Sequence, residues 1–176
     1  YTPRTLFPYT TLFRSLEEAS SGYLLLLRVK DLVGLNQRLG GKRTDELLRA
    51  VGEQLVRQCA HYPETNNLIT RSRGGEFAVL APKMLRAEAL QLAQNLESAL
   101  LSLQATGASD VTPVAYIGLA PYSPGDSPQT LLGLADQALS QAESEGERSW
   151  SCIEHSAAIS LGDDHHAWNN LLDQAL

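Results

Sequence analysis

The charged side chains best placed to do chemistry in this sequence surround two adjacent glycines in the segment Arg71–Phe77. Two runs typical of β-strands, Asn67–Ser72 and Phe77–Leu80, flank the glycines, which therefore fall where a hairpin would turn. Glu76 is the carboxylate of this turn, and without a metal ion beside it the side chain has no obvious chemistry. The other residues of the chain are needed to tell whether the hairpin is a catalytic site, a chance turn or part of a protein that is not an enzyme.

Length and composition indicate one globular domain. The chain has 176 residues, of which 43% are hydrophobic and 19% are charged, values ordinary for a soluble domain with a real core. The net charge of −6 argues against a surface that collects nucleic acid or anionic lipid. Cys59 and Cys152 form no metal-ligand pattern and are predicted to be reduced thiols. No apolar run approaches the roughly 20 residues that a membrane span needs.

The apolar pattern of the first half predicts a strand followed by two helices. Gly22–Val29 is a continuous apolar run, typical of a central strand. Asp31 can cap a short helix that ends at Leu39, before a Gly-Gly pair. A longer helix is predicted from about Thr44, because apolar residues recur on one face until Pro63 stops it.

The second half continues the alternation of strands and helices. Pro82 ends the second strand of the hairpin, and the stretch Pro121–Ser127 is rich in loop-forming residues. Periodicity predicts four further elements, namely a helix from about Leu85 to Leu103, a strand over Val111–Ala120, a helix that starts at Pro128 and a short strand over Ser149–His155. The first seven of these elements have the order βααββαβ, which is that of a ferredoxin-like α+β domain.

The hairpin segment Arg73-Gly74-Gly75-Glu76-Phe77 resembles the GGDEF hairpin of diguanylate cyclases, which join two GTP molecules into cyclic di-GMP. Two more blocks keep the spacing of that family. They are Leu35-Asn36, Gly40, Asp45 and Leu47-Leu48 early in the chain, and Ala135-Asp136, Ala138-Leu139, Ala142 and Gly146 late in it. Residues 22–156 are therefore identified as a member of the family. The resemblance implies a palm-like domain with a central antiparallel sheet and flanking helices.

The resemblance also implies where divalent cations would be bound, because phosphoryl transfer needs them. The family uses an aspartate at the end of the first strand and the first acidic residue of the hairpin. Those positions hold Arg28 and Gly75 here. A guanidinium repels Mg²⁺ and glycine offers no carboxylate, so we expect no metal, no other cofactor and no catalytic residue. Phe77 is expected to persist for packing.

The family's phosphate contacts are a lysine and an arginine around the turn after its last helix. Glu143 and Glu147 occupy these positions, so two attractive contacts become repulsive. A pair of unit charges about 4 Å apart is worth about 4 kcal/mol at an effective dielectric near 20, before any discount for solvent. The alternative, a solvated acidic helix end, is compatible with the same conclusion.

Two further sites of the family can be checked by position. Asn36 and Asp45 match the residues that read guanine, although Asn36 can equally close a short helix and Asp45 can serve the start of the next helix. Glu64 and Asn67 stand where the family's inhibitory site has an arginine and an aspartate. Retained nucleotide contact would therefore be vestigial, and product feedback through this domain is not expected.

The other charged and metal-binding candidates have structural alternatives. Arg71 and Arg73 lie on the same side of an extended strand, where they could pair with acids of a neighbouring domain or remain solvated. The pair His165-His166 has no third ligand nearby, so an exposed linker is favoured over a metal site. The sequence contains no Ser/His/Asp set, P-loop or zinc pattern.

Both ends of the chain are predicted to lie outside the domain. Residues 1–15 include Thr5–Ser15, which is what a sequencing adapter encodes in one frame, so we expect a disordered artefact rather than a real aromatic-rich arm. Residues 16–21 would end an upstream linker. Residues 157–176 would be a linker and the first helix of a truncated EAL domain, because the segment from Trp168 to Leu176 resembles the opening of that cyclic di-GMP phosphodiesterase fold.

These features together predict a catalytically inactive GGDEF domain that regulates a GGDEF–EAL tandem. The hairpin resembles that of LapD-type receptors, which control adhesins in biofilms from the bacterial inner membrane. The resemblance implies that the domain is cytoplasmic and contacts its own EAL domain and an upstream HAMP or linker helix. It could also form a homodimer, and the missing EAL domain would bind cyclic di-GMP. The alternative is a regulatory domain beside an EAL domain that hydrolyses cyclic di-GMP, and an intact EAL motif downstream would distinguish the two.

Overall fold

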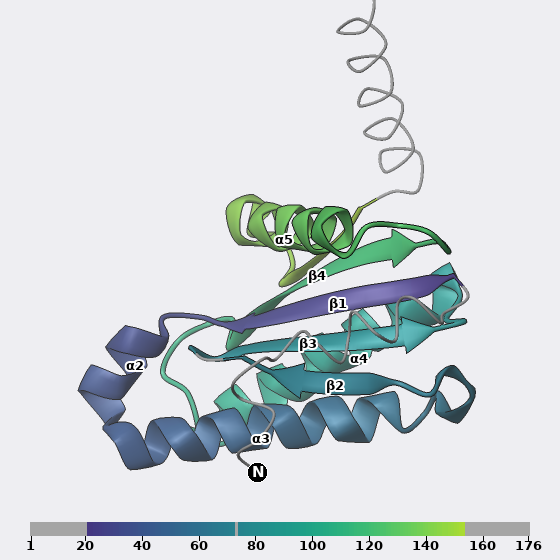
Figure 1. Cartoon of the computed structure of the whole chain (residues 1–176). Coiled ribbons are helices and arrows are strands. Elements are labelled where there is room, and N and C mark those ends of the chain that lie inside the picture. Colours follow the sequence, from purple (N-terminus) through teal and green to yellow (C-terminus); the bar gives the residue numbers. More distant parts are fainter. Residues whose placement is uncertain (1–20, 73, 154–176) are drawn as a thin grey trace, which may run out of the picture.

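A five-stranded sheet with the order β2-β3-β1-β4-β5 forms the centre of the domain (Figure 1). The computed structural model describes residues 21–72 and 74–153. The predictions for the two chain ends, for Arg73 and for His165-His166 therefore lie outside the described residues. The strands are β1 (Gly22–Val29), β2 (Leu68–Arg71), β3 (Glu76–Pro82), β4 (Ala115–Tyr122) and β5 (Trp150–Cys152).

The sheet is antiparallel except at one edge. β1 pairs antiparallel with β3 and β4, β2 pairs antiparallel with β3, and β5 runs parallel to β4. The central place predicted for Gly22–Val29 is confirmed. A strand with neighbours at both edges and helices on both faces needs apolar residues at nearly every position, and β1 has them.

Helices cover both faces of the sheet. Among the described residues they are α2 (Leu32–Leu39), α3 (Gly41–Cys59), α4 (Arg86–Ala105), α5 (Pro128–Glu145) and the short 3₁₀ helix η1 (Pro63–Thr65). Figure 1 shows α3 and α4 on one face and α5 on the other. Leu25 and Leu27 pack with α3 and α4, while Leu24 and Leu26 belong to the core under α5. None of the helices in the described ranges is long and apolar enough to cross a membrane.

The start of α2 is as predicted, but α3 begins three residues early. The Asp31 carboxylate accepts a hydrogen bond from the Gly34 N–H at 3.2 Å, which confirms its capping role. α3 begins at Gly41 rather than near Thr44, because Gly40 adopts a positive φ of 81° that turns the chain directly between the two helices. The Thr44 hydroxyl donates to the Gly40 carbonyl inside the helix at 3.0 Å.

The prediction of a strand over Val111–Ala120 is wrong at its start and its end. β4 begins at Ala115, since Pro113, two residues earlier, has no N–H for a ladder. β4 continues through Pro121 to Tyr122. Proline is tolerated because β5 pairs with Ile117–Leu119, so position 121 lies beyond the end of that neighbour.

The last predicted strand is shorter than expected. β5 spans Trp150–Cys152 instead of the whole range 149–155, and residues from 154 onward lie outside the described residues. Ile153 is still buried under α5, and its N–H donates to the Leu119 carbonyl at 2.9 Å.

The two cysteine thiols differ in environment and should differ in reactivity. Cys59 is buried, and burial raises the pKa of its thiol to about 11, whereas Cys152 is half-buried. Relative to an ordinary thiol this lowers the thiolate fraction at pH 8 about 100-fold. We expect iodoacetamide to alkylate Cys152 well before Cys59 in the native protein, as mapped by mass spectrometry, with equal rates in denaturant. Equal native rates would contradict the burial of Cys59.

Candidate functional site

The glycine hairpin predicted from the sequence is present between β2 and β3. Gly74 and Gly75 have φ values of 81° and 74°, the left-handed region that glycine adopts without steric cost. The Ser72 N–H donates to the Glu76 carbonyl at 2.8 Å, and the Val29 N–H donates to the Gly75 carbonyl at 3.0 Å. The second bond attaches the hairpin to the end of β1.

The two glycines have different surroundings. Nothing lies within 4 Å of a Cβ placed on Gly74, whereas a Cβ on Gly75 would lie 3.1 Å from a Leu32 methyl. It would also lie 3.4 Å from Leu48 and Val29. Any side chain at position 75 would therefore enter a tight apolar space.

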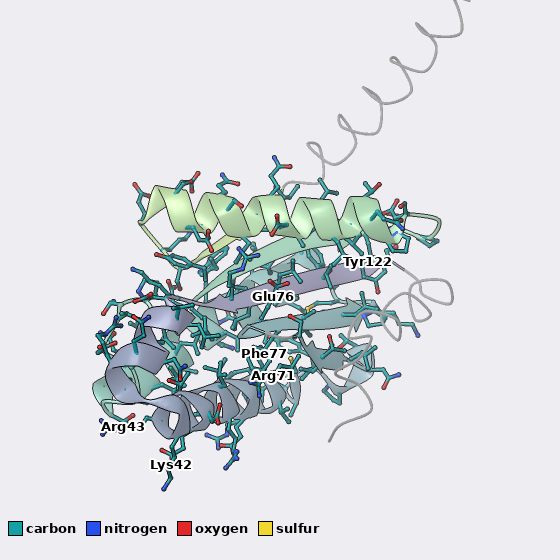
Figure 2. The ribbon with its side chains drawn as sticks, turned by 60° about the vertical axis from the view of Figure 1, so that its left-hand side comes forward. Lys42, Arg43, Arg71, Glu76, Phe77 and Tyr122 are labelled. Carbon is teal, nitrogen blue, oxygen red and sulfur yellow. The ribbon has the colours of Figure 1, made fainter. Side chains whose placement is uncertain are left out.

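Glu76 and Phe77 point to opposite faces of the sheet. Figure 2 shows Glu76 on the side of α5 and Phe77 on the side of α3. The Phe77 ring is 4% exposed and approaches the Gly52 position of α3 closely, with a Cβ at Gly52 lying 3.4 Å from its Cε1 atom. This is the packing position expected for Phe77, while the carboxylate of Glu76 is directed to the other face.

Arg28 lies at the centre of an ion cluster, called here the Arg28 cluster, with Glu76, Asp136 and Glu143. Its guanidinium is 3.2 Å from Glu76 Oε2, 3.1 Å from Asp136 Oδ1 and 3.5 Å from Glu143 Oε1. The cluster joins β1 and β3 to α5. One positive and three negative charges leave it with a net charge of −2.

The acids of the cluster stabilise the charged form of Arg28. Burial lowers the pKa of the guanidinium, but the charges and hydrogen bonds of Glu76, Asp136 and Glu143 outweigh burial and raise the pKa above its ordinary value. Glu143 therefore contacts Arg28 in addition to lying on the acidic end of α5 that was the alternative from the sequence. Asp136 was not predicted as a site residue, although its spacing of seven from Glu143 places both on one face of α5.

The residues at this place do not fit a divalent cation. The group between the carboxylates is itself a cation, and Gly75 presents apolar neighbours instead of a ligand. Within residues 21–72 and 74–153, no group of three or more His, Cys, Asp or Glu side chains is arranged to hold a metal ion.

The two residues expected at a guanine pocket lie outside the Arg28 cluster. Asn36 and Asp45 are exposed on α2 and α3. The Asn36 carbonyl accepts the Gly40 N–H at 3.0 Å, as expected where the short helix closes. Because α3 begins at Gly41, Asp45 lies in the second turn of the helix. It is therefore not at the helix start, where a role in stabilising that start would place it.

The positions of the expected inhibitory site have structural contacts of their own. Glu64 is exposed on η1. The Asn67 side-chain amide donates to the Cys59 carbonyl at 3.1 Å, and its oxygen accepts from the Thr65 hydroxyl. Asn67 thus connects the end of α3 to the start of β2.

Glu147 is separated from Glu143 by the end of α5 and lines a groove of about 180 Å³. The groove lies between the last part of α4, the segment before β4 and the turn into β5, with Leu101 and Tyr116 among its lining residues. Beside Glu147, the Arg148 guanidinium lies over the Trp150 ring at 4.2 Å.

A second ion cluster was not predicted. Arg38 of α2 contacts Asp110 at 2.6 Å and Asp31 at 3.1 Å. The hydrogen bond from Arg38 is the main cause that lowers the pKa of Asp110. Arg71, one of the two hairpin arginines, is exposed and lies 5.8 Å over the Phe77 ring. Both alternatives for Arg71 therefore stay open.

Comparison with known proteins agrees with this fold. RNase E specificity factor CsrD of Escherichia coli (strain K12) is 24% identical over 155 residues, which are 88% of this chain and 24% of that protein. The chain thus spans about a quarter of the curated relative. The GGDEF domain of TpbB, or YfiN, from Pseudomonas aeruginosa has 28% identity and a TM-score of 0.66, with 85% of this chain and 94% of that chain covered.

A tandem protein is also similar in structure. The S helix–GGDEF–EAL chain of Vibrio cholerae LapD, bound to c-di-GMP, has 22% identity and a TM-score of 0.68. The similarity covers 84% of this chain and 34% of that chain. The family model described as "Diguanylate cyclase, GGDEF domain" matches residues 9–149, a range that contains the hairpin, the Arg28 cluster and every described strand except β5. By this match the chain belongs to the GGDEF domain family.

Proposed function

We propose that this domain does not synthesise cyclic di-GMP and acts as a regulatory module between domains of a GGDEF–EAL signalling protein. The observation that carries the proposal is the Arg28 cluster, in which a guanidinium stands among the carboxylates at the end of β1. On this proposal the domain spans residues 22–156, and residues 157–176 lead into an EAL domain.

The first step of the argument concerns cations. Cyclic di-GMP synthesis moves phosphoryl groups, and such reactions rely on divalent cations to neutralise the triphosphate. A divalent cation brought beside Arg28 would be repelled by the guanidinium, while Glu76 and Glu143 are already engaged with it. Gly75 adds no ligand, and the apolar contacts around it leave little room for one.

The second step concerns the triphosphate itself. Glu143 and Glu147, at the end of α5 and just after it, present negative charge where phosphate binding would need positive charge. Both side chains are exposed, so solvent weakens the repulsion, but its sign remains unfavourable. Loss of cation and phosphate contacts in the same domain supports a regulatory role better than slow catalysis.

The third step concerns the parent protein. The LapD chain that is similar to this one carries an S helix and an EAL domain beside its GGDEF domain, and this chain covers about a third of it. By analogy, the EAL domain of the parent would bind cyclic di-GMP as a receptor. The parent would be anchored in the bacterial inner membrane and would control biofilm adhesins.

Incubation of the purified chain with GTP and Mg²⁺ is expected to give no cyclic di-GMP by liquid chromatography and mass spectrometry, beside an active cyclase as positive control. Calorimetry is expected to show no GTP binding at millimolar concentration, because Glu143 and Glu147 repel phosphate. The double variant Glu143→Lys/Glu147→Arg should bind GTP at least about tenfold more tightly, as two repulsions become attractions. Cyclic di-GMP from the unmodified chain would refute the proposal.

The regulatory part needs the complete parent protein. We expect deletion of residues 22–156 to change the affinity of the EAL domain for cyclic di-GMP by about fivefold or more, the usual scale of coupling between sites. An unchanged affinity of the EAL domain for cyclic di-GMP would show that this domain does not regulate it. Hydrolysis of cyclic di-GMP by the parent would replace the receptor assignment with the phosphodiesterase alternative.

A further inference from the structure

We propose that Arg28 is an internal counter-ion that holds the start of β3 to α5, so that their relative position is fixed by the chain itself and not by a bound ligand. The proposal concerns the mechanics of the fold and holds whether or not the proposed function is correct. It predicts that α5 is coupled to β3, a strand on which α5 does not mainly pack.

The contacts of Arg28 span the elements that it would couple. α5 packs mainly over β4, β1 and β5, while β3 lies on the other side of β1 and adds only Ala78 and Leu80 to the core under α5. Arg28 stands at the end of β1 with Glu76 directly beside it in the ladder. From there its side chain also reaches Asp136 and Glu143 on α5. One side chain thus contacts the first residue of β3 and the facing side of α5.

Arg28 is the cation that the three carboxylates of the cluster share. Each ion pair alone contributes little, because the side chains are 22–58% exposed. Removal of Arg28 would do more than delete three weak attractions. It would take away the cation that Glu76, Asp136 and Glu143 share, and the mutual repulsion of their carboxylates would then push the start of β3 and α5 apart.

Two backbone hydrogen bonds report on this coupling. The Val29 N–H donates to the Gly75 carbonyl at 3.0 Å, and the Ser72 N–H donates to the Glu76 carbonyl at 2.8 Å. The acceptors are the backbone carbonyls of Glu76, a member of the cluster, and of its neighbour Gly75. If Glu76 is pushed away from Arg28, these amides should open more often and exchange their hydrogen faster.

The experiment compares Arg28→Gln with Arg38→Gln, a matched control that removes the arginine of the second ion cluster, which has two carboxylates. Hydrogen exchange by NMR is measured on the full chain. In Arg28→Gln we expect the amides of Val29 and Ser72 to exchange about fivefold faster or more, while Arg38→Gln leaves them unchanged. Added NaCl should slow this exchange again in Arg28→Gln, because salt screens repulsion between carboxylates.

A charge-removal variant makes the test decisive. Adding Asp136→Asn and Glu143→Gln to Arg28→Gln removes the repulsion without restoring the arginine, and should return the two amides toward wild-type exchange. Arg28→Lys keeps the positive charge but loses the forked guanidinium that reaches three carboxylates, so we expect an intermediate exchange rate of the two amides. This variant keeps the test informative if Arg28→Gln folds poorly. Unchanged exchange in Arg28→Gln and Arg28→Lys, or the same pattern in Arg38→Gln, would overturn the proposal.

Discussion

Gly118→Ala is expected to destabilise the domain by about 3 kcal/mol or more, because it would drive α5 away from β4. A Cβ at position 118 would lie 2.4 Å from both the Ala135 carbonyl oxygen and the Leu139 nitrogen. These are backbone atoms of a helix, so no side-chain rotation can relieve the clash. Glycine at this position is what allows the helix to approach the sheet so closely.

Urea unfolding followed by circular dichroism measures this effect, and Gly133→Ala is the matched control. Gly133 lies in α5 itself, and nothing is within 4 Å of a Cβ built there. That substitution should stabilise the domain by about 0.5–1 kcal/mol through helix propensity. If Gly118→Ala instead left the free energy of unfolding within about 0.5 kcal/mol of wild type, α5 would not sit this close to β4. Asp136 and Glu143 would then lie farther from Arg28 as well.

The elements with a local signature were predictable from the sequence. β1 is identified by its unbroken apolar run, and the hairpin by two glycines between strand-like segments. α2 is identified by the capping residue Asp31. In each case the residues that decide the structure are neighbours along the chain. Hydrophobic periodicity and turn chemistry therefore carry the information.

The end of β4 was missed because it depends on a partner distant in sequence, whereas the start of α3 was missed at a turn next to it. β4 can run through Pro121 only because β5 ends before it, which no local pattern of β4 reveals. α3 starts at Gly41 because the chain turns at Gly40, whereas the prediction followed the apolar periodicity, which begins later in the helix.

The Arg28 cluster was half visible in the sequence. From the sequence, Arg28 is assigned to a metal position and Glu143 to a phosphate contact, as two separate predictions and not as partners. Their contact depends on how closely α5 approaches the sheet, which Gly118 sets through a steric fit and not through a periodic pattern. The pair Arg38–Asp110 was also missed, because its members are separated by 72 residues along the chain.

Gly75→Asp, which would return the carboxylate typical of the family, is expected to cost about 3 kcal/mol at pH 7 and to give no cyclase activity. The new side chain would enter the space occupied by Leu32, Leu48 and Val29. Burial of an ionised carboxylate among apolar groups is unfavourable unless it is paired. Strain adds to the cost, since a residue with a Cβ must adopt the φ of 74° found at Gly75.

Gly74→Asp separates strain from burial, because Gly74 has a similar φ of 81° but open space around it. We expect this control to cost about 1 kcal/mol. The pH dependence should also differ between the variants. Burial would raise the folded-state pKa of an aspartate at position 75, so its cost is full above that pKa and shrinks as the pH falls toward 4. Urea unfolding at pH 7 and pH 4.5 measures both effects. Equal costs for the two variants at both pH values would mean that position 75 is not part of the core.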